Sequence, residues 1–263
     1  MKQAAAFISF IIQMKIHLVN YAKGQPYETT QKLLNESIRQ HTSYEVVIHD
    51  YCEDKIKQCE WFKHLEDFPG RTIVRKHDDY FCSWKQFIVL DVLRAADEGD
   101  LVYYVDSSRH ARTGFTENLD KFFNFAAEIG GIFACVTDDV RNKDDDTGTN
   151  KQFWDLIGLG HEFETLLTKR HPLTAWYVVP ANERTIKIFE EMCEWIKYRA
   201  PDGRSLVELH HTQEQTIHCA VMLKHGIPAF YAGHCHNAMK DRNLAVSIIN
   251  GANSDLKNFM QPM

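Results

Sequence analysis

Short apolar runs alternate along the chain with longer stretches whose apolar residues recur at helical spacing. Residues 16–21 (Ile-His-Leu-Val-Asn-Tyr) are mostly apolar and end at a turn cluster, Lys-Gly-Gln-Pro, at 23–26. The following stretch, 27–40, carries Leu33, Leu34 and Ile38 at helical spacing. The pattern predicts a strand, a turn and a helix in that order.

The same alternation continues through most of the chain. Further strands are expected at 44–49, 71–75, 101–105, 131–137, 176–179 and 229–232, and further helices at 80–96, 119–127, 183–199 and 213–225. The run at 101–105 (Leu-Val-Tyr-Tyr-Val) is typical of a central strand that is covered on both faces. Strands that alternate with helices favour an α/β fold with a central mixed, mostly parallel sheet flanked by helices. Residues 141–150 are polar and predict a surface loop, either a plain charged segment or a lid over an acceptor.

The length of 263 residues allows one large domain or two small ones. No repeat or low-complexity linker divides the chain, and we predict a single domain over 14–263. The apolar run at 4–12 is shorter than the ~20 residues of a spanning helix, and we expect 1–13 to be a leader or a disordered extension. No other run approaches membrane length, so no integral membrane span is expected.

Charge and cysteine content narrow the function classes. The formal net charge of -6 disfavours a nucleic-acid binder held by phosphate contacts. The seven cysteines are odd in number and irregularly spaced without a CxxC pair, so neither a disulfide framework nor a thiolate zinc site is indicated. A reducing, cytoplasmic compartment fits this cysteine usage best.

Two polar segments are the first functional candidates, because ligands of open α/β sheets lie beyond the carboxyl ends of the strands. Asp106, Ser107 and Ser108 directly follow the apolar run at 101–105. A carboxylate there is suited to Mg²⁺ or Mn²⁺ on a substrate diphosphate, and a turn or cap aspartate is the simpler alternative.

The second segment, Gly-His-Cys-His-Asn-Ala-Met-Lys at 233–240, follows the expected strand at 229–232. His234 and His236 offer nitrogen ligands for a metal, and Lys240 offers a point charge for phosphate. In a chain with 14 histidines, ordinary surface histidines are the alternative.

A family resemblance joins several of these segments. Residues 79–90 (Asp-Tyr-Phe-Cys-Ser-Trp-Lys-Gln-Phe-Ile-Val-Leu) and 98–108 (Glu-Gly-Asp-Leu-Val-Tyr-Tyr-Val-Asp-Ser-Ser) resemble the GT-A-type glycosyltransferases found in bacterial polysaccharide clusters and large viruses. Members show an aromatic-Trp-Lys-Pro segment that opens a helix, and then a strand that ends in DxD or DxG. Here Gln86 replaces the proline, and Ser108 occupies the third position of the second motif.

The resemblance extends from about residue 14 to 243. Residues 176–185 (Trp-Tyr-Val-Val-Pro-Ala-Asn-Glu-Arg-Thr) and the helix end at 194–196 resemble the strand and helix after the acceptor region of these enzymes. Residues 212–216 (Thr-Gln-Glu-Gln-Thr) resemble the acidic-Gln helix start that faces the sugar. The resemblance implies a GT-A-like domain that moves a sugar from a UDP- or GDP-sugar to a hydroxyl of a glycan or similar acceptor.

The implied reaction needs positive charge at the departing diphosphate and a carboxylate near an oxocarbenium-like sugar carbon. For the metal, Mn²⁺ or Mg²⁺, the candidate ligands are Asp106, Ser108, His234 and His236. For the donor, the resemblance implies Tyr21, Ala22, Lys85, Asp106, Ser107, Gln215 and Lys240, with the nucleotide base over Tyr21 and Ala22. For catalysis, the candidate carboxylates are Glu214 first and Asp139 second.

Simpler interpretations stay open for most of these residues. Glu214 has the alternative of an acid at a helix amino end, and Asp139 that of a solvated strand-end residue. Tyr21 and Trp84 have the alternative of core packing, and Lys85 that of a solvent-facing lysine.

Two other function classes also stay open. A nucleotidyltransferase normally shows a glycine-rich loop after its first strand, whereas the segment at 22–26 has one glycine. A noncatalytic module that binds a glycan or nucleotide is favoured by Ser108 in place of a second motif carboxylate.

Overall fold

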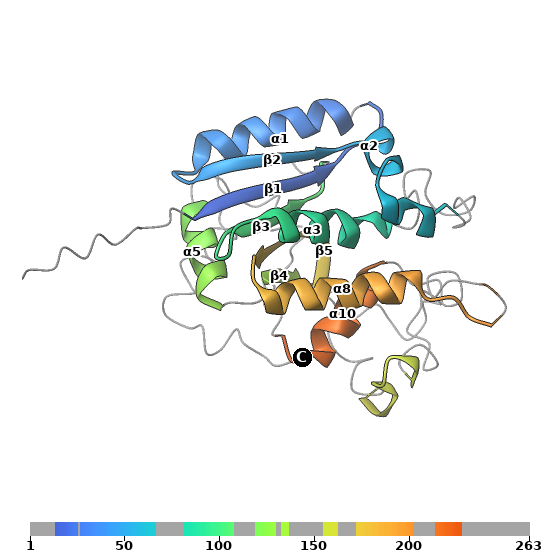
Figure 1. The fold of residues 1–263 in the computed structure, drawn as a ribbon. Coiled ribbons are helices and arrows are strands. Elements are labelled where there is room, and N and C mark those ends of the chain that lie inside the picture. Colours follow the sequence, from blue (N-terminus) through green and yellow to red (C-terminus); the bar gives the residue numbers. More distant parts are fainter. Residues whose placement is uncertain are drawn as a thin grey trace, which may run out of the picture.

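The chain folds as a mixed α/β structure, in agreement with the predicted class. The computed structural model describes residues 14–25, 27–66, 82–107, 119–129, 133–136, 155–162, 172–201, 203 and 214–227. Its strands are β1 (Lys15–Tyr21), β2 (Glu45–Tyr51), β3 (Leu101–Val105), β4 (Phe133–Val136) and β5 (Pro172–Pro180). Figure 1 shows these strands as one layer with helices on either side.

The five strands form one sheet in the order β2-β1-β3-β5-β4. β1 pairs in parallel with both β2 and β3, whereas β5 runs antiparallel to β3 and to β4. Four strands therefore point in one direction and β5 in the other. This arrangement confirms the predicted mixed sheet, although its neighbouring pairs are divided equally between parallel and antiparallel.

Alternating strand residues divide the core into two clusters, one on each face of the sheet. One face packs against α1 (Tyr27–His41) and α5 (Leu119–Ile129), and its buried strand residues are Ile16, Leu18, Leu101, Tyr103, Val105, Trp176 and Val178. The other packs against α3 (Trp84–Ala95), α8 (Glu183–Lys197) and α10 (Glu214–Lys224), and its buried strand residues are Val19, Tyr51, Val102, Tyr104, Tyr177 and Val179. Because both faces are covered, β3 is buried along its whole length.

Helix α3 is largely enclosed by this core. Nine of its 12 residues are buried, so it lacks the polar stripe of a surface helix. It begins at Trp84 rather than at residue 80, where the sequence placed its start. Cys82 has a φ of 57°, a left-handed conformation that cannot continue a right-handed helix.

Helix α8 begins at Glu183, as predicted, because of its cap. The Asn182 side chain accepts a hydrogen bond from the backbone N–H of Thr185, and the Thr185 hydroxyl accepts one from the N–H of Asn182. Beside it, Arg94 of α3 pairs with Glu190 at 2.8 Å. In Figure 1 the two helices lie side by side across the sheet.

Other parts of the prediction differ from the structure or lie outside it. The polar stretch before residue 70 contains two short helices, α2 (Glu53–Lys57) and η1 (Glu60–His64), which bury Ile56 and Phe62. β5 begins at Pro172 instead of Trp176. The leader, the loop at 141–150 and the strands expected at 71–75 and 229–232 lie outside the described residues. A further 3-10 turn, η3, spans Gly160–Glu162.

In the part of the chain that the structure describes, no helix is long and apolar enough to cross a membrane.

Candidate functional site

The carboxyl ends of β1 and β3 lie at the same edge of the sheet, because the two strands are parallel neighbours. Tyr21 and Ala22 follow this edge from β1, and Asp106 and Ser107 follow it from β3. Helices α3 and α10 both begin here, since Lys85 in the first turn of α3 contacts Asp106 and Glu214. The structure thus brings together segments that are far apart in the sequence.

Lys85 lies at the centre of this edge as a buried ammonium group between two carboxylates. Its Nζ is 3.3 Å from Oδ1 of Asp106 and 3.2 Å from Oε1 of Glu214. It also donates to the backbone carbonyl of Thr174 at 3.5 Å. Only 6% of Lys85 is exposed, which excludes the alternative of a solvent-facing lysine.

Each carboxylate is also held by a hydroxyl group. The Tyr104 hydroxyl donates to Oδ1 of Asp106 at 2.6 Å, and the Thr174 hydroxyl donates to Oε1 of Glu214 at 2.7 Å. We call these five residues, Tyr104, Asp106, Lys85, Glu214 and Thr174, the Lys85 cluster. The contacts to Lys85 and to the hydroxyl groups engage one oxygen of each carboxylate, Oδ1 of Asp106 and Oε1 of Glu214.

The charges of the Lys85 cluster are strongly coupled. Burial alone lowers the pKa of Lys85, but Asp106 and Glu214 outweigh burial and hold this pKa well above its usual value. Burial and Asp106 also hold the pKa of Tyr104 well above its usual value, so its hydroxyl stays a donor. With both carboxylates ionised, the cluster carries one net negative charge.

Aromatic rings line the cluster on the side of β1. The rings of Tyr21 and Trp84 lie 4.2 Å apart between centroids. The Lys85 ammonium lies 5.9 Å from the Trp84 ring centre and 5.6 Å from that of Tyr104, within the range of cation–π attraction. Trp84 is 5% exposed, which confirms its packing role, while Tyr21 is only partly buried beside it.

Two further polar side chains lie behind the cluster. Tyr177 stacks on Tyr104 at 5.1 Å and contacts the ring of His218 at 4.9 Å. His218 lies one turn after Glu214 in α10 and is fully buried. Burial and the charge of Lys85 lower the pKa of His218 to about 3. Neither His218 nitrogen, nor the Tyr177 hydroxyl, has a hydrogen-bond partner within the described residues.

The sequence missed four of these residues, among them Tyr104, which lies within the apolar run of β3. Thr174 precedes residue 176, where the sequence placed the start of this strand, so the sequence did not place Thr174 at the edge of the sheet. Tyr177 sits in the middle of an apolar run, where a core role is the default. For His218 a signal did exist, because positions four apart in a helix share a face and Glu214 was already a candidate.

The remaining predicted site residues divide into two groups. Ala22 is buried after β1, with its N–H donating to the Tyr51 carbonyl at 3.0 Å. Ser107 is buried after Asp106, and Gln215 follows Glu214 in the first turn of α10. The second group, Asp139, Ser108, His234, His236 and Lys240, lies outside the described residues.

A divalent cation would rely on few protein ligands here. Within the part of the chain that the structure describes, no three His, Cys, Asp or Glu side chains gather as a metal site. Asp106 offers one carboxylate oxygen beside a cluster with net negative charge. This fits Mg²⁺ or Mn²⁺, which often use one or two carboxylates and take their other oxygens from phosphate and water.

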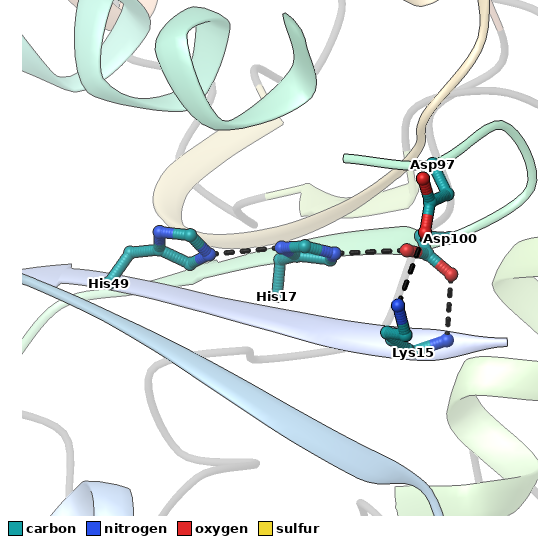
Figure 2. A network of polar contacts seen from close by, with 5 residues as sticks. All are labelled: Lys15, His17, His49, Asp97 and Asp100. Carbon is teal, nitrogen blue, oxygen red and sulfur yellow. Dashed lines mark hydrogen bonds and ion pairs between the residues drawn. The ribbon is translucent and has the colours of Figure 1, made fainter. Parts of the chain in front are cut away.

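A second polar network lies at the opposite, amino end of β1 and β3. Figure 2 shows this His17 network, which consists of Lys15, His17, His49, Asp97 and Asp100. His17 contacts His49 at 2.9 Å between ring nitrogens and Asp100 at 3.0 Å. Asp100 also accepts from the backbone N–H of Lys15 at 2.8 Å.

The contacts of the His17 network serve the sheet. They join β1, β2 and the residue before β3, and the backbone of Asp100 pairs with Ala181 after β5. Burial, His17 and Lys55 together lower the pKa of His49 to about 4. His49 is therefore neutral near pH 7, and we assign the network a structural role.

No protein-family model matches this chain, and no curated protein matches its sequence.

Proposed function

We propose that this chain is a glycosyltransferase with a GT-A-like domain, which moves a sugar from a nucleotide-diphosphate donor to a hydroxyl of a glycan or similar acceptor. The observation that carries the proposal is the convergence of Lys85, Asp106 and Glu214 at the carboxyl ends of β1 and β3. In open α/β sheets this edge is where ligands bind.

Lys85 supplies the positive charge that a departing diphosphate needs. Its raised pKa keeps the ammonium protonated across the neutral range, and its buried surroundings make that charge more effective than it would be in water. The side chain is already oriented, so little reorganisation accompanies the reaction.

Asp106 is the proposed protein ligand of Mn²⁺ or Mg²⁺. When bound, the cation adds positive charge at the diphosphate and polarises the bond to the leaving group. Tyr104 and Lys85 hold Oδ1 of Asp106, which fixes the carboxylate and directs its other oxygen to the ligand. Ser108, His234, His236 and Lys240 stay candidates for additional contacts.

Glu214 is the proposed carboxylate near the sugar carbon, where positive charge develops during transfer. Its Oε1 is taken by Lys85 and Thr174, so its electrostatic contribution comes with a fixed geometry. Asp139 stays the second candidate for this role.

The nucleotide base is proposed to lie over Tyr21 and Ala22. Trp84 supports the Tyr21 ring from the protein side at 4.2 Å, so a base that stacks on Tyr21 meets a surface that is already rigid.

Thermal unfolding with nucleotides tests the proposal. UDP, GDP, CDP and ADP are each added with and without Mn²⁺, and a bound nucleotide raises Tm by mass action. We expect at least one nucleotide with Mn²⁺ to raise Tm, and Asp106→Ala to lose most of that shift.

The matched control for this test is Asp97→Ala. Asp97 is an exposed carboxylate that pairs with Lys15 at the opposite end of the sheet, so its loss should leave the nucleotide-induced shift intact. Absence of a shift with every nucleotide would sink the proposal.

A noncatalytic nucleotide- or glycan-binding module is the second candidate, and one observation favours it. Ser108 stands in place of a second motif carboxylate, so Asp106 is the only acidic residue of the segment at 106–108. Donor hydrolysis by the purified protein separates the two functions. Nucleotide binding without turnover, across UDP- and GDP-sugars and glycan acceptors, would support the module.

A further inference from the structure

We propose that a chain of buried amide side chains positions residues 21–22, over which the proposed function places the nucleotide base. We call these two residues the base segment. The amides are Gln31, Asn20 and Asn35, and together with Asp50, where the chain of hydrogen bonds ends, we call them the Asn20 network. The inference deepens the proposed function and rests on it for the identity of the ligand.

The Asn20 network lies at the edge of the sheet where ligands of α/β folds bind. Asn20 and Asp50 are each the next-to-last residue of their strand, and they are paired neighbours in the register of β1 and β2. Gln31 and Asn35 come from α1, which lies along these two strands in Figure 1. They are two of the four buried residues of this helix. Half of the buried face of α1 is therefore polar, and its polar part meets the carboxyl ends of the strands.

The hydrogen bonds of the Asn20 network run in one direction. Asn35 donates to Oδ1 of Asp50 at 2.6 Å, and Asn20 donates to Oδ1 of Asn35 at 2.6 Å. Gln31 donates through Nε2 to Oδ1 of Asn20 at 2.7 Å and to the backbone carbonyl of Tyr51 at 3.2 Å. The Asp50 carboxylate offers acceptors only, so it orients the three amides one after another.

The Tyr51 carbonyl connects this network to the base segment. It accepts from the backbone N–H of Ala22 at 3.0 Å as well as from Gln31. On the other side of the base segment, the Asn20 side chain is held by two amides, one as donor and one as acceptor. The base segment is thus fixed at Ala22 and at the residue that precedes Tyr21.

Burial of three amides is not the simplest way to stabilise the contact between α1 and the sheet. Asn20 is fully buried, and Gln31 and Asn35 are 8% and 6% exposed, so each amide loses water and needs its hydrogen bonds. Apolar side chains of similar shape would avoid that cost. A satisfied polar network instead fixes one geometry, and a segment that is already ordered loses less entropy when a base binds to it.

Amide hydrogen exchange measures the positioning without any ligand. NMR follows the exchange of the Ala22 N–H, with the N–H of Val19 in the middle of β1 as the internal reference. Gln31→Met keeps the length of the side chain and removes its donors to Asn20 and Tyr51. We expect the Ala22 N–H to exchange about fivefold faster relative to Val19 in this variant.

Ligands with and without a base show whether the positioning serves nucleotide binding. Isothermal titration calorimetry compares UDP, GDP and inorganic diphosphate, each with Mg²⁺. Gln31→Met should bind the nucleotide that the wild type binds about fivefold more weakly, because its base meets a less ordered segment. Inorganic diphosphate should bind the variant and the wild type equally, since it has no base.

The matched control is Asn182→Ala, which removes another amide side chain with a structural hydrogen bond. Asn182 accepts from the Thr185 N–H at the start of α8, next to Ala181, which pairs with Asp100 at the opposite end of the sheet. Loss of this cap should lower Tm. The exchange of Ala22 relative to Val19, and the affinity for nucleotide relative to diphosphate, should stay as in the wild type.

If Gln31→Met does not fold, Asp50→Ala decides the outcome. Asp50 is exposed, so its replacement spares the core while the network loses the acceptor that orients it. We expect the same two changes in this variant, each about twofold.

Three results would overturn the inference. The first is unchanged exchange of Ala22 in the deciding variant, and the second is the same acceleration in Asn182→Ala. The third is faster exchange with unchanged nucleotide affinity, or with equal weakening of nucleotide and diphosphate, which would leave the network a purely structural role. If the wild type binds neither nucleotides nor diphosphate while Ala22 exchanges as expected, the network still positions residues 21–22 and the proposed function fails.

Discussion

Lys85 shows how much the surroundings of one residue decide its role. The sequence left this lysine between a solvent-facing and a functional position, and its exposed fraction of 6% excludes the solvent-facing one. Lysines are almost never fully buried unless they are paired, and here two carboxylates supply the pairing. The ion pairs explain why α3 tolerates a charge among buried apolar residues.

Removal of the Lys85 charge should therefore be costly. In Lys85→Met the side chain keeps its length, but Asp106 and Glu214 lose the cation between them. We expect the free energy of unfolding to fall by about 3 kcal/mol, measured by urea denaturation at pH 7.

Lys187→Met is the matched control for this change, because Lys187 also pairs with a glutamate, Glu183, but on the exposed surface of α8. Its unfolding curve should overlay that of the wild type. Equal stability of Lys85→Met and wild type would contradict the buried ion pairs.

At the scale of elements, the His17 network ties the sheet at the end opposite to the site. It depends on neutral His49, whose pKa is lowered to about 4, against about 6.5 in an unfolded chain. On acidification, His49 takes up a proton at a higher pH in the unfolded chain than in the folded protein. The stability contribution of neutral His49 is therefore complete above pH 6.5. It is lost as the pH falls from 6.5 towards 4.

The expected pH dependence can be measured with His49→Gln. Urea denaturation at pH 7, 5.5 and 4.5 should show that the wild type loses more stability on acidification than the variant does. His218, with a pKa lowered to about 3, also loses its stability contribution on acidification, in the wild type and the variant alike. The same holds for the carboxylates whose pKa values are lowered. Identical pH slopes for the two proteins would refute the role of His49.

Most elements in the described residues were predictable because each carries a local signal. The apolar run at 101–105 became β3 with the same bounds, and the helix expected from residue 183 begins there as α8. The start of α3 was not predictable, since the left-handed backbone of Cys82 follows from tertiary structure. Helices as short as α2 contain too few residues for a periodic pattern.

At the scale of the whole molecule, the candidate site could be predicted in part. The rule for strand ends pointed to Asp106, and the resemblance pointed to Lys85 and Glu214. Their direct contact depends on where α10 packs, which no local pattern in the sequence indicates. Thr174 was missed for the same reason, because its role arises only from its contact with a helix 40 residues away.

The distribution of charge also matters at this scale. The chain carries a formal net charge of -6, and the formal charges of Lys85, Asp106 and Glu214 account for one of these negative charges. Under the proposed function, a diphosphate would meet one buried cation of the described residues, Lys85, between two anions. Additional positive charge from a divalent cation at Asp106 is the simplest way to balance the donor.

The most direct test is the electron density of a crystal of this chain soaked with UDP or GDP and Mn²⁺. The account predicts a diphosphate at the carboxyl ends of β1 and β3, in contact with Lys85, with Mn²⁺ on Asp106 and the base over Tyr21. The account would be contradicted by a nucleotide bound at another place. It would also be contradicted if neither UDP nor GDP appeared in the density at saturating concentration.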